Sequence, residues 1–262
     1  MDAIKSAAQY LTELRNTGRF GARLPEPSRP ATLDDALKIQ DRMVRVYGQE
    51  VGGYKCSVPN PERTVIAPIF APTIQSSGPC YVRAATPQAG DTARIEPEIA
   101  FELGQDLPPR ATPYTEEEIR AAVGEVRLVL ELLGCRYLDP KGLPFIEMVA
   151  DCVSNQGLFL GPPVAGGLDA ALLTFPLRIE RLDGPAPVLV KEHQGKHPDG
   201  GPLLPLYWIA NFQAARGVGL RAGQIITTGS YAGMIDVPLS APLRIRFGDL
   251  GEILVEFRRK ED

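Results

Sequence analysis

The chain has 262 residues, with 28 Lys and Arg against 32 Asp and Glu and a formal net charge of −4 at pH 7. This length can bury a large core, as one large domain or as one domain with a helical extension. The mildly acidic balance without a basic cluster argues against a nucleic-acid partner, and no apolar run approaches the roughly 20 residues that span a bilayer.

Two helices are predicted before residue 50. The first has an apolar stripe at helical spacing, made by Ile4, Ala8, Leu11 and Leu14. Behind the capping residue Thr32, a second stripe is made by Ala36, Ile39, Met43 and Tyr47. The N-terminus lacks the apolar centre of a signal peptide, and the cysteines show no CxxC spacing. We therefore expect a cytoplasmic protein with reduced cysteines.

A short strand then carries a lysine in an apolar setting, Gly53-Tyr54-Lys55-Cys56. If this strand is buried, the ammonium of Lys55 needs an anion beside it or must lose its proton. A lone lysine in a strand is more often a surface residue whose stem covers apolar neighbours. The residues alone leave both interpretations open.

Two carboxylates occupy alternate positions of a later apolar strand, Ile95 to Phe101. Side chains alternate along a strand, so Glu96 and Glu98 face the same side, about 6–7 Å apart. Like charges this close are costly unless a cation or protons lie between them. The alternative is a solvated sheet face, which the spacing leaves equally open.

A third carboxylate, Glu131, lies in the apolar strand from Leu128 to Leu133. It can join Glu96 and Glu98, or it can pair with an arginine. Three carboxylates on neighbouring strands form an oxygen-rich site suited to Mg²⁺, Mn²⁺ or Ca²⁺ rather than to zinc. A capping box at 115–118 predicts a helix before this strand, with an apolar side made by Ile119, Ala122, Val123 and Val126.

The apolar stretch 145–153 is predicted as a helix, which places Asp151 and Ser154 on one face. They can orient water or substrate oxygens, and a capping role is equally open. His193 and His197 lie in a polar, loop-like stretch, and we expect both at the surface. The C-terminal third is predicted mostly as strand and ends in a hairpin made by 243–247 and 253–257.

These motifs resemble those of the 2-keto-4-pentenoate hydratase and 4-oxalocrotonate decarboxylase group of the fumarylacetoacetate hydrolase superfamily. Six of them stand in the family's order and cover most of the chain. They are Asp35-Ala36-Leu37-Lys38-Ile39-Gln40, Gly53-Tyr54-Lys55, Glu96-x-Glu98 with Glu131, Val149-Ala150-Asp151 with Ser154, Leu206-Tyr207-Trp208-Ile209-Ala210-Asn211, and 220–224 continuing to Thr228-Gly229-Ser230.

The resemblance implies an α+β fold: a mixed β-roll with flanking helices and a small helical N-terminal region. The N-terminal region with the first strand would cover 1–70 and the catalytic β-roll 71–262. It also implies a homo-oligomer. The implied metal is Mg²⁺ (or Mn²⁺), held by Glu96, Glu98 and Glu131. The implied catalytic residues are Lys55, Asp151 and Ser154, and the implied substrate contacts are Lys55, Phe70, Thr228 and Ser230.

The implied reaction is the metal-dependent addition of water to a 2-hydroxy-2,4-dienoate, through its 2-oxo-3-enoate tautomer, in the breakdown of aromatic compounds. Decarboxylation of a 2-oxo-3-enedioate ranks second. Hydrolysis of a carbon–carbon bond ranks third, because that branch uses an N-terminal His–Glu pair and no histidine precedes His193. A non-catalytic protein stabilised by its metal ranks last.

Two positions depart from the family's pattern. Ala67 stands in the segment where members carry an Asp that helps proton transfer, and Cys152 stands where they carry Asn. If the first alignment holds, the proton route runs through Lys55 and water, or the substrate differs from the usual one.

Overall fold

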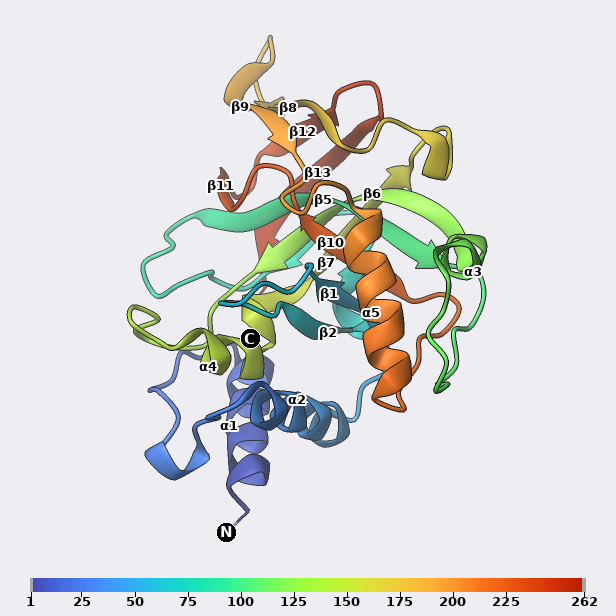
Figure 1. The fold of residues 1–262 in the computed structure, drawn as a ribbon. Coiled ribbons are helices and arrows are strands. Elements are labelled where there is room, and N and C mark those ends of the chain that lie inside the picture. The colour runs from blue at the N-terminus through green and yellow to red at the C-terminus, as the bar shows by residue number, and fades with distance from the viewer. Residues whose placement is uncertain (1, 261–262) are drawn as a thin grey trace.

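The computed structural model describes residues 2–260, and two sheets dominate it (Figure 1). The larger, eight-stranded sheet has the order β2-β1-β10-β5-β6-β7-β3, with β11 paired to β5. Its strands are β1 (Val51–Cys56), β2 (Ile66–Phe70), β3 (Ile74–Gln75), β5 (Thr92–Leu103), β6 (Val123–Leu133), β7 (Asn155–Pro163), β10 (Ile225–Ser230) and β11 (Ile235–Pro238).

The smaller, five-stranded sheet has the order β4-β13-β12-β8-β9. Its strands are β4 (Cys80–Val82), β8 (Thr174–Arg181), β9 (Val188–Lys196), β12 (Pro242–Phe247) and β13 (Glu252–Arg259). The predicted C-terminal hairpin is confirmed, since β12 and β13 pair antiparallel with Ile245 opposite Ile253. The segment expected as a loop around His193 is instead β9, an edge strand paired with β8.

The helices are α1 (Ala3–Thr17), α2 (Leu33–Tyr47), α3 (Glu116–Ala122), α4 (Phe145–Ala150) and α5 (Leu203–Ala215), with short 3-10 turns at Glu26–Ser28, Ala71–Thr73, Cys152–Ser154 and Gly167–Asp169. The two predicted N-terminal helices are confirmed. Gly18 ends α1 at a φ of 66°, and Thr32 caps α2 through a capping box with Asp35. Two predicted helices are shorter than expected: α3 ends before Val123, which begins β6, and α4 ends at Ala150.

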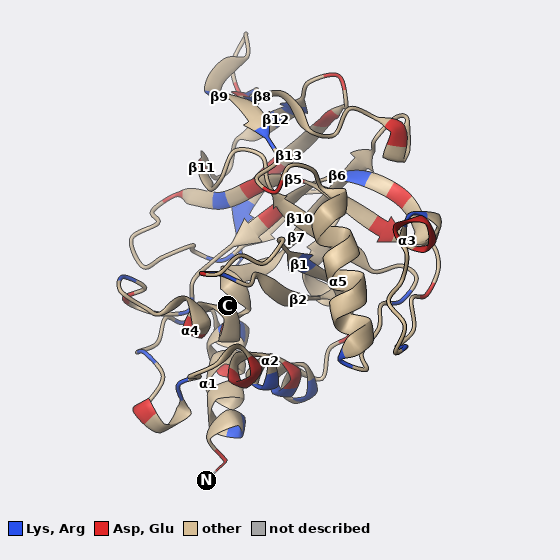
Figure 2. Cartoon of the chain, in the orientation of Figure 1, with Lys and Arg blue, Asp and Glu red and all other residues tan. Residues whose placement is uncertain are grey.

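The main apolar core lies between the two sheets and under α5. Residues of the larger sheet such as Ile99 and Phe101 pack there with Leu243 and Phe247 of the smaller sheet. No charged residue occurs between Leu203 and Ala215, so α5 is tan throughout in Figure 2. Ile99 and Phe101 of β5 face this core, so the residues that alternate with them along β5 lie on the other face of the sheet.

That other face is covered in part by α1, α2 and α4, which share a second core cluster with Ala67 of β2. β1 and β2 precede residue 71, yet they belong to the same sheet as β10. The proposed boundary at residue 70 stays a prediction. Across residues 2–260, no helix combines the length and the apolar character needed to cross a membrane.

Candidate metal and acid–base site

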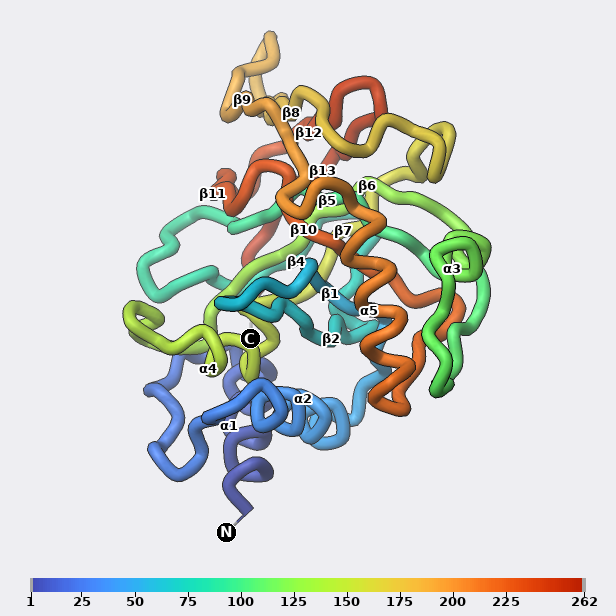
Figure 3. Tube along the Cα trace, viewed as in Figure 1, coloured from blue at the N-terminus to red at the C-terminus, as the bar shows by residue number. Residues whose placement is uncertain are grey.

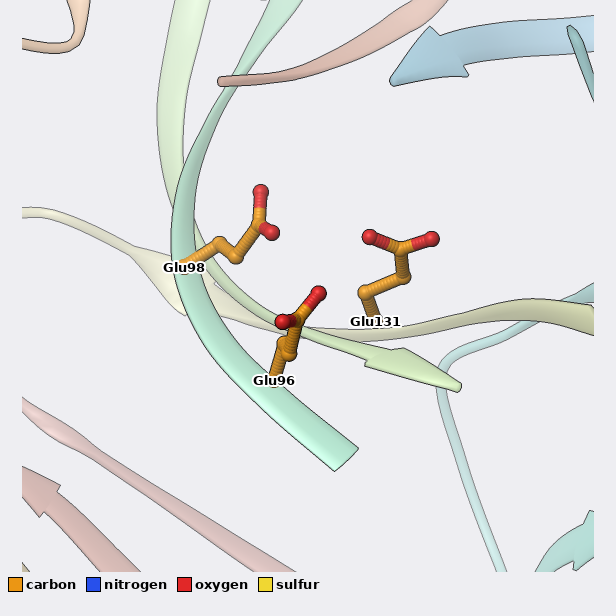
Figure 4. A group of neighbouring side chains, drawn as sticks. All are labelled: Glu96, Glu98 and Glu131. Carbon is orange, nitrogen blue, oxygen red and sulfur yellow. The ribbon is translucent and has the colours of Figure 1, made fainter. Parts of the chain in front are cut away.

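Three carboxylates meet on the face of the larger sheet that is turned away from the main core. Glu96 of β5 and Glu131 of β6 are direct partners across the antiparallel pair, and Glu98 lies two residues further along β5. One carboxylate oxygen from each lies within 4.8 Å of those of the other two. Figure 4 shows the three side chains turned toward one space. The strand alternation seen in the sequence thus brings the predicted residues together.

The three carboxylates are shielded from water rather than spread over a solvated sheet face. Glu98 is 2% exposed and Glu131 is fully buried, so the solvated alternative is wrong. Burial and the neighbouring Glu131 raise the pKa of Glu96 to about 7. Burial and the other two carboxylates raise the pKa of Glu98 well above its usual range. The cluster needs positive charge to hold all three groups ionised at neutral pH.

The cluster fits a hard divalent cation. Glu131 Oε2 is buried and has no hydrogen-bond partner among the described residues. A buried oxygen of this kind is costly unless something binds it. Oxygen ligands are the type that Mg²⁺, Mn²⁺ and Ca²⁺ prefer, and three carboxylates leave part of the coordination shell open to other ligands. Glu102, which has the same strand parity, is paired with Arg127 instead.

Lys55 supplies the positive charge beside the three carboxylates in this structure. Its Nζ lies 2.7 Å from Glu131 Oε1 and 3.4 Å from the carbonyl oxygen of Val153. Only 7% of the residue is exposed, so the surface interpretation of this lysine is wrong. Burial acts to lower the pKa of Lys55, but Glu131 and the other two carboxylates outweigh it, and the pKa is raised. Lys55 is therefore an ammonium at neutral pH.

Two further residues hold the carboxylates in place, and the sequence did not single them out for this. Asn155 Nδ2 donates to Glu131 Oε1 at 2.9 Å, and the amide of Gly229 donates to Glu98 Oε2 at 3.0 Å. Gly229 has a φ of 125°, and a Cβ there would lie 3.1 Å from Pro198. A side chain at position 229 would therefore push this amide away from Glu98.

Asp151 and Ser154 do not share a helix face as expected. Asp151 follows the last residue of α4, and Cys152, Val153 and Ser154 all have positive φ, at 55°, 48° and 61°. This conformation costs an L-residue roughly 1–2 kcal/mol. It turns the Val153 carbonyl toward Lys55, while the Ser154 carbonyl accepts a hydrogen bond from the amide of Gly134.

Asp151 acts on the cluster only through its neighbours. It is buried, and both of its carboxylate oxygens accept hydrogen bonds from Arg136 Nε, at 2.8 and 3.0 Å. Arg136 also donates to the carbonyl oxygen of Asn155 at 2.8 Å. Asp151 thus positions Arg136, and Arg136 hydrogen-bonds the backbone carbonyl of Asn155. The side chain of Asn155 in turn binds Glu131.

The three predicted substrate contacts other than Lys55 lie in different settings. The ring of Phe70 is fully buried and packs edge-on against Tyr47 at 4.7 Å. The hydroxyl of Thr228 donates to the Ile99 carbonyl, on the main-core side of the sheet. Ser230 lies opposite Glu98 in the β10–β5 pair and is the nearest of the three to the carboxylates along the sheet. All three roles stay predictions.

Thr227, rather than Thr228, shares the sheet face of the carboxylates. It lies between Lys55 of β1 and Ala100 of β5 in the register of the sheet. Its hydroxyl oxygen is buried and has no partner among residues 2–260. The sequence offered two adjacent threonines, and only the strand register separates them.

Ala67 lies directly opposite Lys55 in the β1–β2 pair and is fully buried. The segment that lacks the family's Asp is therefore next to the site lysine. A carboxylate introduced at this position would lie on the same face of the sheet as the ammonium.

The expectation that both histidines lie at the surface is wrong for His197. His193 is exposed on β9, but His197 is 1% exposed and its ring packs against Tyr231 at 5.3 Å. Its Nδ1 accepts a hydrogen bond from the Asp199 amide, and burial lowers its pKa. The buried ring of His197 therefore packs beside the turn that carries Gly229.

Known proteins of similar sequence include hydratases and a decarboxylase. The chain is 27% identical over 267 residues to a 2-keto-4-pentenoate hydratase of Paraburkholderia xenovorans, covering 98% of this chain and 96% of the relative. It is 28% identical over 165 residues to a 4-oxalocrotonate decarboxylase of a Pseudomonas species, covering 61% of this chain and 59% of the relative. No family model matches the chain.

Solved structures show the same fold. The 4-oxalocrotonate decarboxylase of Pseudomonas putida G7, complexed with magnesium and adipate, superposes with a TM-score of 0.76 at 20% identity and covers 97% of both chains. The same enzyme complexed with calcium and acetate gives 0.74 at 20% identity and 97% coverage of both chains. A yeast fumarylacetoacetate hydrolase family protein gives 0.52 at 15% identity, covering 79% of this chain and 92% of that one. The predicted resemblance and the α+β fold of the fumarylacetoacetate hydrolase type are confirmed.

Proposed function

We propose that this chain is a divalent-metal-dependent lyase that adds water to a 2-hydroxy-2,4-dienoate. One observation carries the proposal: a buried lysine ammonium lies 2.7 Å from one of three clustered carboxylates. A buried ammonium beside three clustered acids, two of them buried, is a poor stabilising device, because desolvation of the charges offsets most of the gain from the ion pair. Perturbed, coupled groups of this kind are typical of catalytic sites.

Glu96, Glu98 and Glu131 would hold the cation, for which we propose Mg²⁺ or Mn²⁺. When bound, such a cation supplies a Lewis acid that polarises the carbonyl of a 2-oxo acid. Asn155 and Gly229 donate hydrogen bonds that orient Glu131 and Glu98. Mutation of such partners of metal ligands commonly lowers metal affinity by about 10–100-fold. A small 2-oxo acid is the partner chemistry that suits this site.

Lys55 is the residue we assign to proton transfer or to substrate carboxylate binding. Its Nζ carries a proton at neutral pH and lies at the edge of the carboxylate cluster, where it can donate to a substrate oxygen or carbon. The Val153 carbonyl and Glu131 orient the ammonium. Because no acidic side chain stands at Ala67, we propose that the proton route uses Lys55 and water.

Decarboxylation of a 2-oxo-3-enedioate is the second candidate, because the same residues can stabilise negative charge at the same carbon. The structural similarity to a decarboxylase, which covers 97% of both chains, supports this second candidate. Hydrolysis of a carbon–carbon bond is disfavoured, since the sequence has two histidines and both follow residue 190. A homo-oligomeric state and a cytoplasmic location stay predictions.

The test is an assay of the purified protein with Mg²⁺ and a panel of 2-hydroxydienoates. Loss of diene absorbance without release of CO₂ indicates hydration. Release of one CO₂ for each substrate molecule consumed indicates decarboxylation. Glu131→Gln should remove most turnover and weaken Mg²⁺ binding, whereas Glu102→Gln, on the same strand as two of the ligands, should leave both close to wild type. Full activity of Glu131→Gln in chelator-treated buffer would contradict the metal-dependent mechanism.

A further inference from the structure

A cavity lined by several cationic side chains lies at the end of α1, apart from the three carboxylates. It has a volume of about 450 Å³, within the range of small-molecule sites. The end of α1, the loop after β6 and the end of β13 all contribute to its wall. Figure 3 shows α1 beside α2, whose last residue, Tyr47, also lines the cavity. We call this cavity the cationic pocket, after its charged lining residues Arg15, Arg19, Arg83, Arg136 and Lys260.

The charge of this pocket is opposite to that of the chain. Acidic residues outnumber basic ones in the sequence, 32 to 28. Among the described residues that line the pocket, however, none is an Asp or Glu. A concave wall with one sign of charge focuses the field and attracts counter-ions of the opposite sign.

Arg15 and Arg136 are the two buried members of this group, and Arg15 is the one without a carboxylate partner in residues 2–260. It is 8% exposed, and in residues 2–260 it forms no ion pair. Its Nη2 donates to the Asn155 carbonyl at 2.9 Å, while its Nε is buried without a partner in the described part of the chain. Arg136, which donates to the same carbonyl, is neutralised by Asp151. The Arg15 guanidinium lies over the ring of Phe70 at 5.2 Å, but no carboxylate of the described residues contacts it directly. A buried guanidinium in this setting favours the binding of an anion.

Aromatic residues complete the wall. Phe20, Tyr47 and Tyr81 line the pocket together with the cations. They offer apolar surface to a short hydrocarbon chain, while guanidinium groups bind carboxylates with two parallel hydrogen bonds. Arg19 and Lys260 are exposed and lie where an entering anion would meet them.

We propose that the cationic pocket is a binding site for a small carboxylate, with Arg15 as its buried partner and Arg19 and Lys260 at its mouth. The site is separate from the metal cluster, because Asn155 stands between them: its carbonyl accepts from Arg15, and its side chain donates to Glu131. Two sources have this chemistry. One is a free carboxylic acid, and the other is a carboxylate of this chain, since the acidic residues Glu261 and Asp262 follow Lys260 in the sequence.

The experiment titrates succinate into metal-free protein in calorimetry, with uncharged succinamide as the matched probe. The pocket residues varied below are not among the residues of the metal cluster, so the result does not depend on the proposed lyase activity. We expect one saturable succinate site and no succinamide binding. Arg15→Met should weaken succinate at least tenfold. Arg19→Met with Lys260→Met should weaken it severalfold, which keeps the test open if Arg15→Met fails to fold. Arg120→Met, on α3 outside the pocket lining, should change nothing.

Truncation after Lys260 separates the two sources. Equal succinate affinity in the full and the truncated chain supports a free acid as the ligand. Binding that appears only after truncation supports the chain's own carboxylates as the occupant. Either result depends on the same pocket and the same arginine. The proposal is overturned if neither chain binds succinate, or if the pocket variants bind it as tightly as Arg120→Met does.

Discussion

The metal-free protein should lose stability as the pH rises from about 5 to about 8. Burial and Glu131 raise the pKa of Glu96 from its usual 4.5 to about 7 in the folded chain. Between these two values the folded state binds more protons than the unfolded state does, so the free energy of unfolding falls with rising pH. This stability is fully present below 4.5 and is lost once the pH exceeds 7.

The size of the effect follows from the same shift. Moving one carboxyl pKa from 4.5 to about 7 corresponds to about 3 kcal/mol between the two protonation states. For a chain of this size, 1 kcal/mol changes the melting temperature by about 2–4 °C, so we expect a fall of about 6–12 °C. The pKa of Glu98 is raised for the same reason, so this residue also makes the free energy of unfolding fall as the pH rises. The lowered pKa of His197 acts in the opposite direction and reduces the sum.

Thermal unfolding followed by circular dichroism in chelator-treated buffer measures this directly. Millimolar Mg²⁺ should remove most of the pH dependence, because the ion replaces the protons between the carboxylates. Glu96→Gln should flatten the curve without metal, and Glu102→Gln, whose partner is Arg127, should not. A metal-free melting temperature that rises over this range, or an unchanged slope in Glu96→Gln, would refute the argument that the cluster is under electrostatic strain.

Four further predictions concern three residues around the cluster. Lys55→Met should keep metal binding but lower turnover by about 10²–10⁴-fold, measured by steady-state kinetics and calorimetry; normal turnover would mean that another residue moves the proton. In the same variant, a sharp loss of oxalate binding would identify Lys55 as a carboxylate anchor, and unchanged binding would identify it as a proton shuttle. Asn155→Ala should weaken Mg²⁺ binding by about 10–100-fold, because Glu131 Oε1 loses its amide donor, and calorimetry giving a wild-type affinity would contradict this. Ala67→Asp should raise hydration of simple 2-hydroxydienoates, since the new carboxylate faces the same side as its register partner Lys55; lower activity with intact folding would indicate that this wall holds a bulkier substrate.

Much of the metal site was predictable because strand periodicity is a local property. Glu96 and Glu98 alternate with apolar residues, which fixes their common face whatever the rest of the fold does. The same holds for the N-terminal helices, whose caps at Thr32 and Gly18 are local signals. The family motifs then supplied the fold and the link between Glu131 and the pair on β5.

The sequence failed where a residue's environment depends on distant segments. Helical spacing placed Asp151 and Ser154 on one face, but the chain adopts a left-handed turn after Asp151, held by contacts to Gly134 and Lys55. The polar residues around His197 suggested a surface loop, yet its ring is buried and packs against Tyr231. Such positions are decided by tertiary packing, which overrides local composition.

By itself, the sequence determined which side chains could share a face, because alternation within one strand and capping within one helix involve only neighbouring residues. Only the tertiary structure decided which faces meet. The register of β5 against β6 sets Glu96 opposite Glu131, and the parallel pairing of β1 with β10 selects Thr227 over Thr228 as the neighbour of Lys55. A shift of one residue in either register would move these side chains to the opposite face of the sheet, and no local signal in the sequence specifies that register.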